Sequence, residues 1–258
     1  MSKLRSAIYG FAVADALGVP FEFRERGTFR CEGMTGYGTW NQGPGTWSDD
    51  TSMTLATLDS IKEKKCIDTV DIASRFCDWL HKGKYTADGD TFDVGTTTRM
   101  ALERGSGLDD YYSNGNGSLM RILPLAFTDA SDDEIRAVSA ITHAHKISTE
   151  ACVEYVHLAR KLMDGKPINR DEIKNKSMDE IKSSGFVLHT LEASIWCLLN
   201  TSSYKEAVLA AVNLGEDTDT TAAVVGGLAG IIYGYDSIPG AWIDELKNKE
   251  LIDSILNK

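Results

Sequence analysis

Two short acidic clusters, far apart in the sequence, constrain the fold of this chain more than any other feature. One is Asp217-Thr218-Asp219-Thr220, and the other is Ser48-Asp49-Asp50-Thr51. Each cluster places two carboxylates beside hydroxyl groups at an expected helix start. Carboxylates this crowded repel one another unless a cation neutralises them, and Mg²⁺ is the ion that favours such oxygen ligands. If the fold brings the clusters together, they can hold a pair of such ions.

Composition limits the class of protein. The 258 residues are 42% hydrophobic with only 5 prolines, which is enough apolar material for one large domain, expected over residues 1–258. The net charge of −11 argues against general binding of nucleic acid, but cations or helix N-termini can still hold a small phosphate-bearing molecule. The most apolar stretch, 222–235, is too short to span a bilayer, and the 5 scattered cysteines indicate reduced thiols. We therefore expect a cytoplasmic globular protein without a membrane partner.

The spacing of apolar residues is typical of helices. It predicts helices over 3–18, 51–65, 68–82, 94–104, 131–143, 147–164, 188–200, 203–214 and 218–233. The cap of the second helix is expected at Ser48, Asp49 or Asp50. Alternating strand-like runs are nearly absent, so the fold class is all-α. Glycine-rich residues 27–47 are expected to form a long loop of the kind that often covers a site, and 161–185 to form an exposed excursion.

A glycine-rich turn, Gly115-Asn116-Gly117-Ser118, precedes an apolar segment. Such a turn feeding a short helix exposes backbone N–H groups that can cradle phosphate oxygens, although many similar turns bind nothing. Three single residues are ambiguous at this level. Glu22 is a lone acid among apolar residues, where a surface ion pair is the default role. Asp93 is either a helix cap or a further carboxylate of the acidic site, and the default role of His143 is that of a structural histidine.

The segment Asp217-Thr218-Asp219-Thr220-Thr221 also matches the D-x-D-x-T nucleophile loop of haloacid-dehalogenase-type phosphatases. That loop needs a buried β-strand directly before it. Residues 207–214 have a helical pattern instead, and the rest of the chain lacks alternation of strands and helices. The sequence therefore disfavours this phosphatase interpretation.

Taken together, the motifs resemble those of the ADP-ribosylglycohydrolases, in particular the bacterial branch that includes dinitrogenase reductase-activating and ADP-ribosylarginine hydrolases. The resemblance runs from about residue 4 to residue 235 in the order of the family. The matching segments are Asp15-Ala16-Leu17-Gly18, Pro20 and Glu22, Pro44 to Thr51, Asp93 and Gly95, Gly115-Asn116-Gly117, Met120-Arg121, Thr142-His143, and Gly215 to Thr220. The two acidic motifs together are highly specific, and the other segments support them.

The resemblance implies an orthogonal all-α multi-helix bundle around a cleft that holds two Mg²⁺ or Mn²⁺ ions. By position, the implied metal ligands are Ser48, Asp49, Asp50, Asp217, Asp219 and Thr220. The implied substrate-binding residues are Gly115, Asn116, Gly117 and Ser118 at the pyrophosphate, together with His143 in the cleft. Glu22 falls on an acid beside the metals that is implicated in catalysis or gating. Tyr111 and Tyr112 are candidates for stacking on the adenine.

The activity implied is metal-assisted hydrolysis of the bond between the distal ribose of ADP-ribose and an acceptor, most readily protein arginine, with ADP-ribose as product. Catalytic roles are expected for Glu22, Asp49, Asp93 and Asp219, and the sequence does not decide whether Glu22 or Asp93 transfers the proton. The resemblance favours a monomer. The alternatives are a hydrolase of serine-linked or polymeric ADP-ribose, a non-catalytic ADP-ribose-binding member, and a metal-dependent phosphohydrolase.

Overall fold

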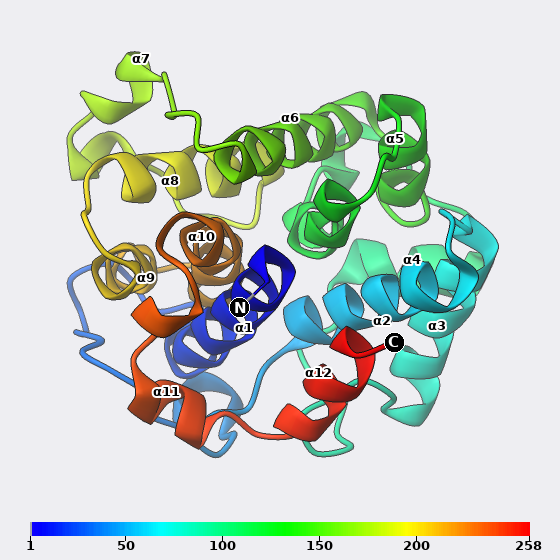
Figure 1. The fold of residues 1–258 in the computed structure, drawn as a ribbon, viewed down its shortest axis with the longest axis horizontal. Helices are drawn as coiled ribbons and strands as arrows, with labels where there is room; N and C mark the ends of the chain where they lie inside the picture. Colours follow the sequence, from blue (N-terminus) through cyan, green and yellow to red (C-terminus); the bar gives the residue numbers. More distant parts are fainter. Residues whose placement is uncertain (1) are drawn as a thin grey trace.

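The chain folds into helices joined by short turns and loops, as a computed structural model of residues 2–258 shows (Figure 1). The α-helices are α1 (Lys3–Gly18), α2 (Asp49–Lys64), α3 (Thr69–Lys82), α4 (Thr96–Arg104), α5 (Asp132–Ala140), α6 (Lys146–Met163), α7 (Asp171–Lys174), α8 (Val187–Leu199), α9 (Tyr204–Asn213), α10 (Thr218–Tyr233), α11 (Gly240–Glu245) and α12 (Lys249–Leu256). Short 3₁₀-helices are η1 (Val19–Phe21), η2 (Gly38–Trp40), η3 (Tyr111–Ser113), η4 (Asn116–Arg121), η5 (Leu123–Phe127), η6 (Met178–Glu180) and η7 (Tyr235–Ser237).

The helices cross one another steeply instead of aligning in one direction. In Figure 1, α2 and α6 run across the view, whereas α9 and α10 are seen nearly end-on. Within residues 2–258, extended pairing is limited to isolated bridges such as Leu108 with His143. The prediction of an all-α bundle is therefore confirmed. No helix in the described part of the chain is long and apolar enough to cross a membrane.

The pair α1 and α10 forms the centre of the molecule, and small residues line the contact between them. Both helices are buried along nearly their whole length. A Cβ atom on Gly10 would lie only 2.5 Å from the carbonyl oxygen of Gly226. A Cβ atom on Gly230 would lie 2.2 Å from the carbonyl oxygen of Ser6 in α1. Glycine at these positions lets the two backbones touch, which fixes how the N-terminus of α10 sits beside the C-terminal half of α1.

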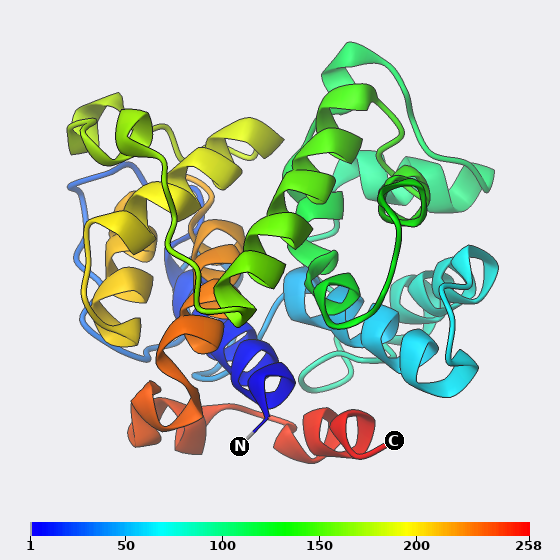
Figure 2. The ribbon, with the colours of Figure 1, turned by 45° about the horizontal axis from the view of Figure 1, so that its top comes forward.

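The other helices pack around this pair. Figure 2 shows α8 and α9 on one side of α10, with α6 crossing above the centre and α2 and α3 on the opposite side. The buried hydrophobic cluster is continuous and includes residues from Ala7 to Ile255. The N-terminus of α2 points into the space beside α1 and α10, where it meets the N-terminus of α10.

Ser48, one of the three predicted positions, is the cap of α2, since its hydroxyl accepts a hydrogen bond from the N–H of Asp50 at 3.3 Å. Other boundaries differ from the predicted ones. The predicted helix over 94–104 begins only at Thr96, after Gly95. The excursion 161–185 contains the short helix α7, and Ile173 anchors it in the core.

The C-terminal helices α11 and α12 were not predicted. Helix α12 buries Ile252 and Ile255 on one face, and α11 buries Trp242. The three-residue spacing of the two isoleucines is a helical signal, but it covers barely two turns. Helices this short form because they pack on the rest of the molecule, not because of local preference alone.

Substitution of Gly10 by alanine should destabilise the fold, because the new Cβ would press on the backbone of α10. We expect the free energy of unfolding to fall by about 1–3 kcal/mol, the usual cost of overpacking a core. Urea denaturation would measure the change. Gly240→Ala is the matched control, since a Cβ at that position meets open space. Equal midpoints for the two variants would contradict the close α1–α10 contact.

Candidate metal centre and binding cleft

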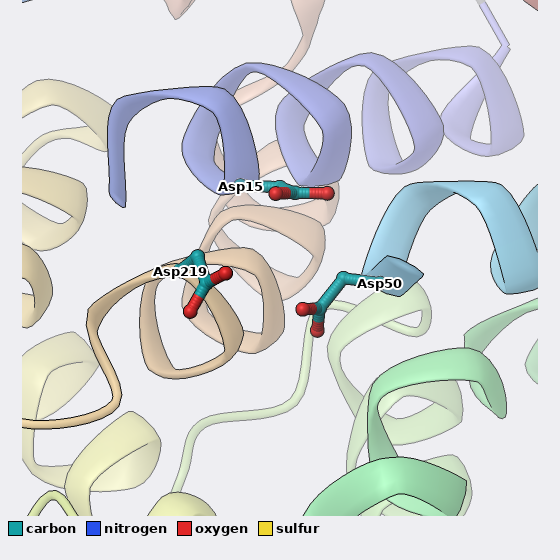
Figure 3. Close-up of side chains that lie close together, drawn as sticks. All are labelled: Asp15, Asp50 and Asp219. Atoms are coloured by element: carbon teal, nitrogen blue, oxygen red, sulfur yellow. The ribbon is translucent and has the colours of Figure 1, made fainter. Parts of the chain in front are cut away.

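The two acidic clusters meet in the fold. Each lies at a helix N-terminus. Ser48 to Thr51 begins α2, and Asp217 to Thr220 begins α10. The hydroxyl of Thr220 donates a hydrogen bond to Oδ2 of Asp50 at 3.1 Å, which joins segments 170 residues apart. The hydroxyl of Ser48 donates to the same oxygen at 3.0 Å. Figure 3 shows Asp50 and Asp219 facing one another across the space between α2 and α10, with Asp15 of α1 beside them.

Burial makes this concentration of negative charge costly. Asp50 and Asp219 are fully buried, and burial followed by the neighbouring carboxylates raises the pKa of each well above its ordinary value. Asp49 lines the cleft, and the same two causes raise its pKa well above the ordinary value. Burial also raises the pKa of Asp217 to about 6, although a hydrogen bond from Asn116 opposes the shift. The cluster therefore disfavours its own ionised form in the absence of a cation.

The carboxylate oxygens left without partners belong to this cluster. Oδ1 of Asp50, Oδ1 of Asp217 and Oδ2 of Asp219 are buried and accept no hydrogen bond from residues 2–258. Asp217 is the cap residue of α10, yet its side chain makes no capping hydrogen bond. Unpartnered buried carboxylate oxygens are rare in folded proteins. An all-oxygen set of this kind fits a hard divalent cation such as Mg²⁺ or Mn²⁺.

Two groups of carboxylates bring one oxygen from each member to within 4.8 Å of the others. The first is Asp15, Asp50 and Asp219, and the second is Glu22, Asp93 and Asp219. Asp219 belongs to both groups and joins them into one acidic site.

Asp15 is the site residue that the sequence analysis did not single out. It comes from α1 and accepts hydrogen bonds from the N–H of Ser48 at 3.0 Å, the N–H of Thr51 at 3.0 Å and the hydroxyl of Thr51 at 2.6 Å. These bonds satisfy free N–H groups at the start of α2 and fasten that helix to α1. The sequence signal for Asp15 was its place in the segment Asp15-Ala16-Leu17-Gly18, which matches the family but was assigned no role.

Glu22 and Asp93 lie at the edge of the acidic site. Glu22 follows η1, and its carboxylate accepts a hydrogen bond from the indole N–H of Trp40, in the loop 27–47. Burial and then the charge of Asp93 raise the pKa of Glu22 to about 9. Asp93 has a left-handed backbone with φ of 53°, and the cap of α4 is Gly95. The helix-cap interpretation of Asp93 is therefore wrong, and the structure brings its carboxylate to Glu22 and Asp219.

A cleft of about 260 Å³ opens from the acidic site. Its lining includes Glu22, Asp49, Asp93, Asp217 and Thr220 of the acidic site, and also Gly115, Asn116, Gly117 and His143. The side chain of Asn116 donates to Oδ2 of Asp217 at 2.9 Å and so connects the glycine-rich turn to the acidic site. A Cβ on Gly117 would lie 2.8 Å from Cε1 of His143, so this position has room only for glycine.

Ser118 differs from the other residues of the glycine-rich turn. It is fully buried, its hydroxyl accepts a hydrogen bond from Ser139 at 2.9 Å, and it lies 3.4 Å from the sulfur of Cys152. The structure therefore does not bring this hydroxyl to the cleft, and the substrate-binding role of Ser118 stays a prediction. Ser118 is buried together with Leu119 and Met120, the apolar residues that follow it.

A second cavity of about 490 Å³ adjoins the cleft at Gly115 and Gly185, which line both. Its walls include Tyr111, Tyr112 and Phe186. The cavity with the aromatic rings therefore lies next to the cleft with the carboxylates.

Comparison with known proteins shows the family to which the chain belongs. The family model for ADP-ribosylglycohydrolase matches residues 1–258. The chain belongs to the ADP-ribosylglycohydrolase family. It is 33% identical to the ADP-ribosylarginine hydrolase Tri1 of Serratia proteamaculans, over 99% of this chain and 78% of that protein. It is 31% identical to the ADP-ribosyl-[dinitrogen reductase] glycohydrolase of Rhodospirillum rubrum, over 94% of this chain and 90% of that protein.

A solved structure described as an ADP-ribosylglycohydrolase-related protein complex has the same fold. Its TM-score to this chain is 0.80 at 29% sequence identity, and the match covers 98% of this chain and 95% of that one. The family membership and the enzyme class expected from the motifs are thereby confirmed. The helix that precedes Asp217, α9, also occupies the position where the haloacid-dehalogenase interpretation required a strand.

Divalent cations should stabilise the protein if the unpartnered oxygens bind them. We expect Mn²⁺ at about 100 times its Kd to add about 2.7 kcal/mol to the free energy of unfolding, measured as a rise in Tm by calorimetry. Asp219→Asn should be more stable than the wild type without metal, since it removes a buried charge, but gain little from Mn²⁺. Asp244→Asn, an exposed control on α11, should behave like the wild type. The same Mn²⁺-dependent gain in Asp219→Asn and the wild type would contradict the assignment.

Stability without metal should fall as the pH rises from about 5 to 9. Asp217 has its pKa raised from 3.8 to about 6, and Glu22 from 4.5 to about 9. The folded state therefore binds more protons than the unfolded state over this window, and its advantage is lost as these carboxyls ionise. Urea denaturation in EDTA at several pH values would measure the slope. Glu22→Gln should reduce the loss, and an identical slope in this variant would rule out the contribution of Glu22.

Proposed function

We propose that the chain is a Mg²⁺- or Mn²⁺-dependent hydrolase that releases ADP-ribose from ADP-ribosylated arginine, in a protein or a small conjugate. The observation that carries the proposal is the set of unpartnered carboxylate oxygens where α2 and α10 meet, at the end of a cleft that continues to aromatic rings. The names of the relatives, an ADP-ribosylarginine hydrolase and a dinitrogen reductase glycohydrolase, support the arginine linkage. We further expect a cytoplasmic monomer that forms a single domain over residues 1–258.

The proposed ligands of two ions are Ser48, Asp49, Asp50, Asp217, Asp219 and Thr220. Asp50 and Asp219 of this set bring carboxylate oxygens to within 4.8 Å of one another. Asp15 is best regarded as an outer residue, because its oxygens already accept hydrogen bonds from α2. The chemistry that such ions supply when bound is Lewis-acid polarisation and a lower pKa for water.

The acidic end of the cleft is the proposed place of bond cleavage. Departure of the acceptor from the distal ribose builds positive, oxocarbenium-like charge on the sugar, which nearby carboxylates stabilise. Glu22 and Asp93 are the two carboxyls at the edge of the site, and we assign proton transfer to this pair. The hydrogen bond from the indole of Trp40 holds the carboxylate of Glu22 in place.

The rest of ADP-ribose is proposed to extend along the cleft, away from the acidic end. Gly115, Asn116 and Gly117 would lie along the diphosphate, where the lack of side chains on the two glycines allows close approach. His143 faces the same stretch. The adenine would then enter the adjoining cavity beside Tyr111 or Tyr112.

Incubation with an ADP-ribosyl-arginine peptide and Mn²⁺ should yield free ADP-ribose and unmodified peptide, measured by mass spectrometry, and EDTA should stop the reaction. Asp219→Asn should lower kcat/KM by at least about 10³-fold, because it removes a carboxylate common to both groups. Glu22→Gln should lower kcat more than it raises KM. Asp244→Asn should retain full activity.

Other products would point to the other candidate functions. Release of AMP or phosphate would indicate a phosphohydrolase. Cleavage only of serine-linked or polymeric ADP-ribose would indicate that the acceptor is serine or another ADP-ribose unit instead of arginine. Binding of ADP-ribose without turnover of any conjugate would indicate a non-catalytic member.

A further inference from the structure

A buried arginine stands behind the histidine of the cleft. Arg121 ends η4 and has no exposed surface. Its guanidinium donates to the carbonyl of Val138 at 3.1 Å, to the carbonyl of Ser139 at 3.4 Å and to the hydroxyl of Thr142 at 2.7 Å. It also lies 4.5 Å above the ring of Phe76. The side chain makes no contact with the acidic site and is separate from the proposed metal ligands.

The donors and acceptors available to Thr142 determine the direction of its hydrogen bond with His143. A guanidinium can only donate, so the hydroxyl oxygen of Thr142 accepts from Arg121. The hydroxyl proton of Thr142 then needs an acceptor, because the residue is fully buried. Among residues 2–258 its remaining partner is Nδ1 of His143, at 2.8 Å. Nδ1 therefore accepts a hydrogen bond and carries no proton.

The opposite tautomer is disfavoured by the same count. If Nδ1 of His143 carried the proton, the hydroxyl of Thr142 would receive two donors and leave its own proton without a partner in a buried place. A doubly protonated imidazolium is disfavoured as well, since burial and the charge of Arg121 lower the pKa of His143 to about 3. The ring is thus neutral, with its single proton on Nε2.

The ring presents Nε2 to the cleft. His143 lines that cleft beside Gly115 and Gly117, and Nε2 has no hydrogen-bond partner in the described chain. The backbone of His143 is held from both sides, by its N–H bond to the carbonyl of Ser139 at 3.0 Å and by its bridge to Leu108. Neither the ring nor its backbone is free to turn the donor elsewhere.

We propose that Arg121 and Thr142 are positioning residues that keep His143 as a neutral, fixed Nε2–H donor directed at an acceptor oxygen of the ligand in the cleft. The assignment of that oxygen to ADP-ribose rests on the proposed function, whereas the tautomer does not. This arrangement makes His143 a binding residue and excludes it as the base that accepts a proton during hydrolysis. A donor held in one orientation before the ligand arrives binds with a smaller entropy loss.

The tautomer can be measured directly in the ligand-free protein labelled with ¹⁵N at histidine. The chain contains 5 histidines, and the spectrum of His143→Ala identifies the signals of His143 by their loss. We expect Nδ1 at the chemical shift of an unprotonated nitrogen and Nε2 at that of a protonated one. A proton on Nδ1, or on both nitrogens at neutral pH, would overturn the proposal whether or not the protein hydrolyses ADP-ribosyl conjugates.

Two substitutions at Thr142 test the hydrogen bonds that join Arg121, Thr142 and His143. Thr142→Val removes the hydroxyl at nearly constant volume and should mix the two tautomers, whereas Thr142→Ser should keep the wild-type spectrum. Calorimetric titration with ADP-ribose should show about 3- to 10-fold weaker binding for Thr142→Val and wild-type binding for Thr142→Ser. Wild-type spectra and affinity in Thr142→Val would refute the role of Thr142. If Thr142→Val does not fold, the wild-type and Thr142→Ser spectra still decide the tautomer.

Failure of the wild type to bind ADP-ribose, together with an Nε2-protonated His143, would reject the proposed function and leave this inference standing. The reverse result, tight binding with an Nδ1-protonated ring, would do the opposite.

Discussion

The meeting of two helix N-termini on α1 is the constraint on which the rest of the structure depends. Helices α2 and α10 both direct their first turns at the C-terminal half of α1, and each carries carboxylates there. The partial positive charge of a helix N-terminus offsets part of the repulsion between them. Burial and then the remaining repulsion still raise the pKa of Asp50 and Asp219 well above the ordinary value. Binding of a cation would therefore reduce the repulsion between the buried carboxylates of this site.

Close backbone contact makes this geometry rigid. The glycines between α1 and α10 bring the two helices into contact, and Asp15 then fastens the start of α2 to α1. A shift of any of the three helices would separate the acidic groups that share Asp219. Much of the central packing can therefore be understood as support for one acidic site, which stays buried at a cost in stability.

The cleft combines two kinds of surroundings along one path. Near α2 and α10 the walls are carboxylates, suited to cations and to positive charge that develops on a sugar. Towards Gly115 and His143 the walls are glycines and an imidazole ring whose Nδ1 is hydrogen-bonded to the buried hydroxyl of Thr142. Beyond Gly185 they become aromatic. The combination of carboxylates, glycines and aromatic rings is the one on which the proposed binding of ADP-ribose rests.

The sequence by itself determined the helical class, most helix positions, the two acidic motifs and the family, because these depend on local spacing and on short motifs. It could not show that Asp15 belongs to the site, that Ser118 turns away from it, or that Asp93 is no helix cap. Nor could it show that Arg121 and Thr142 stand behind His143. Only the tertiary structure decided these points, since each depends on contacts between segments distant in the chain. Burial and hydrogen-bond partners are properties of that packing, and no local pattern encodes them.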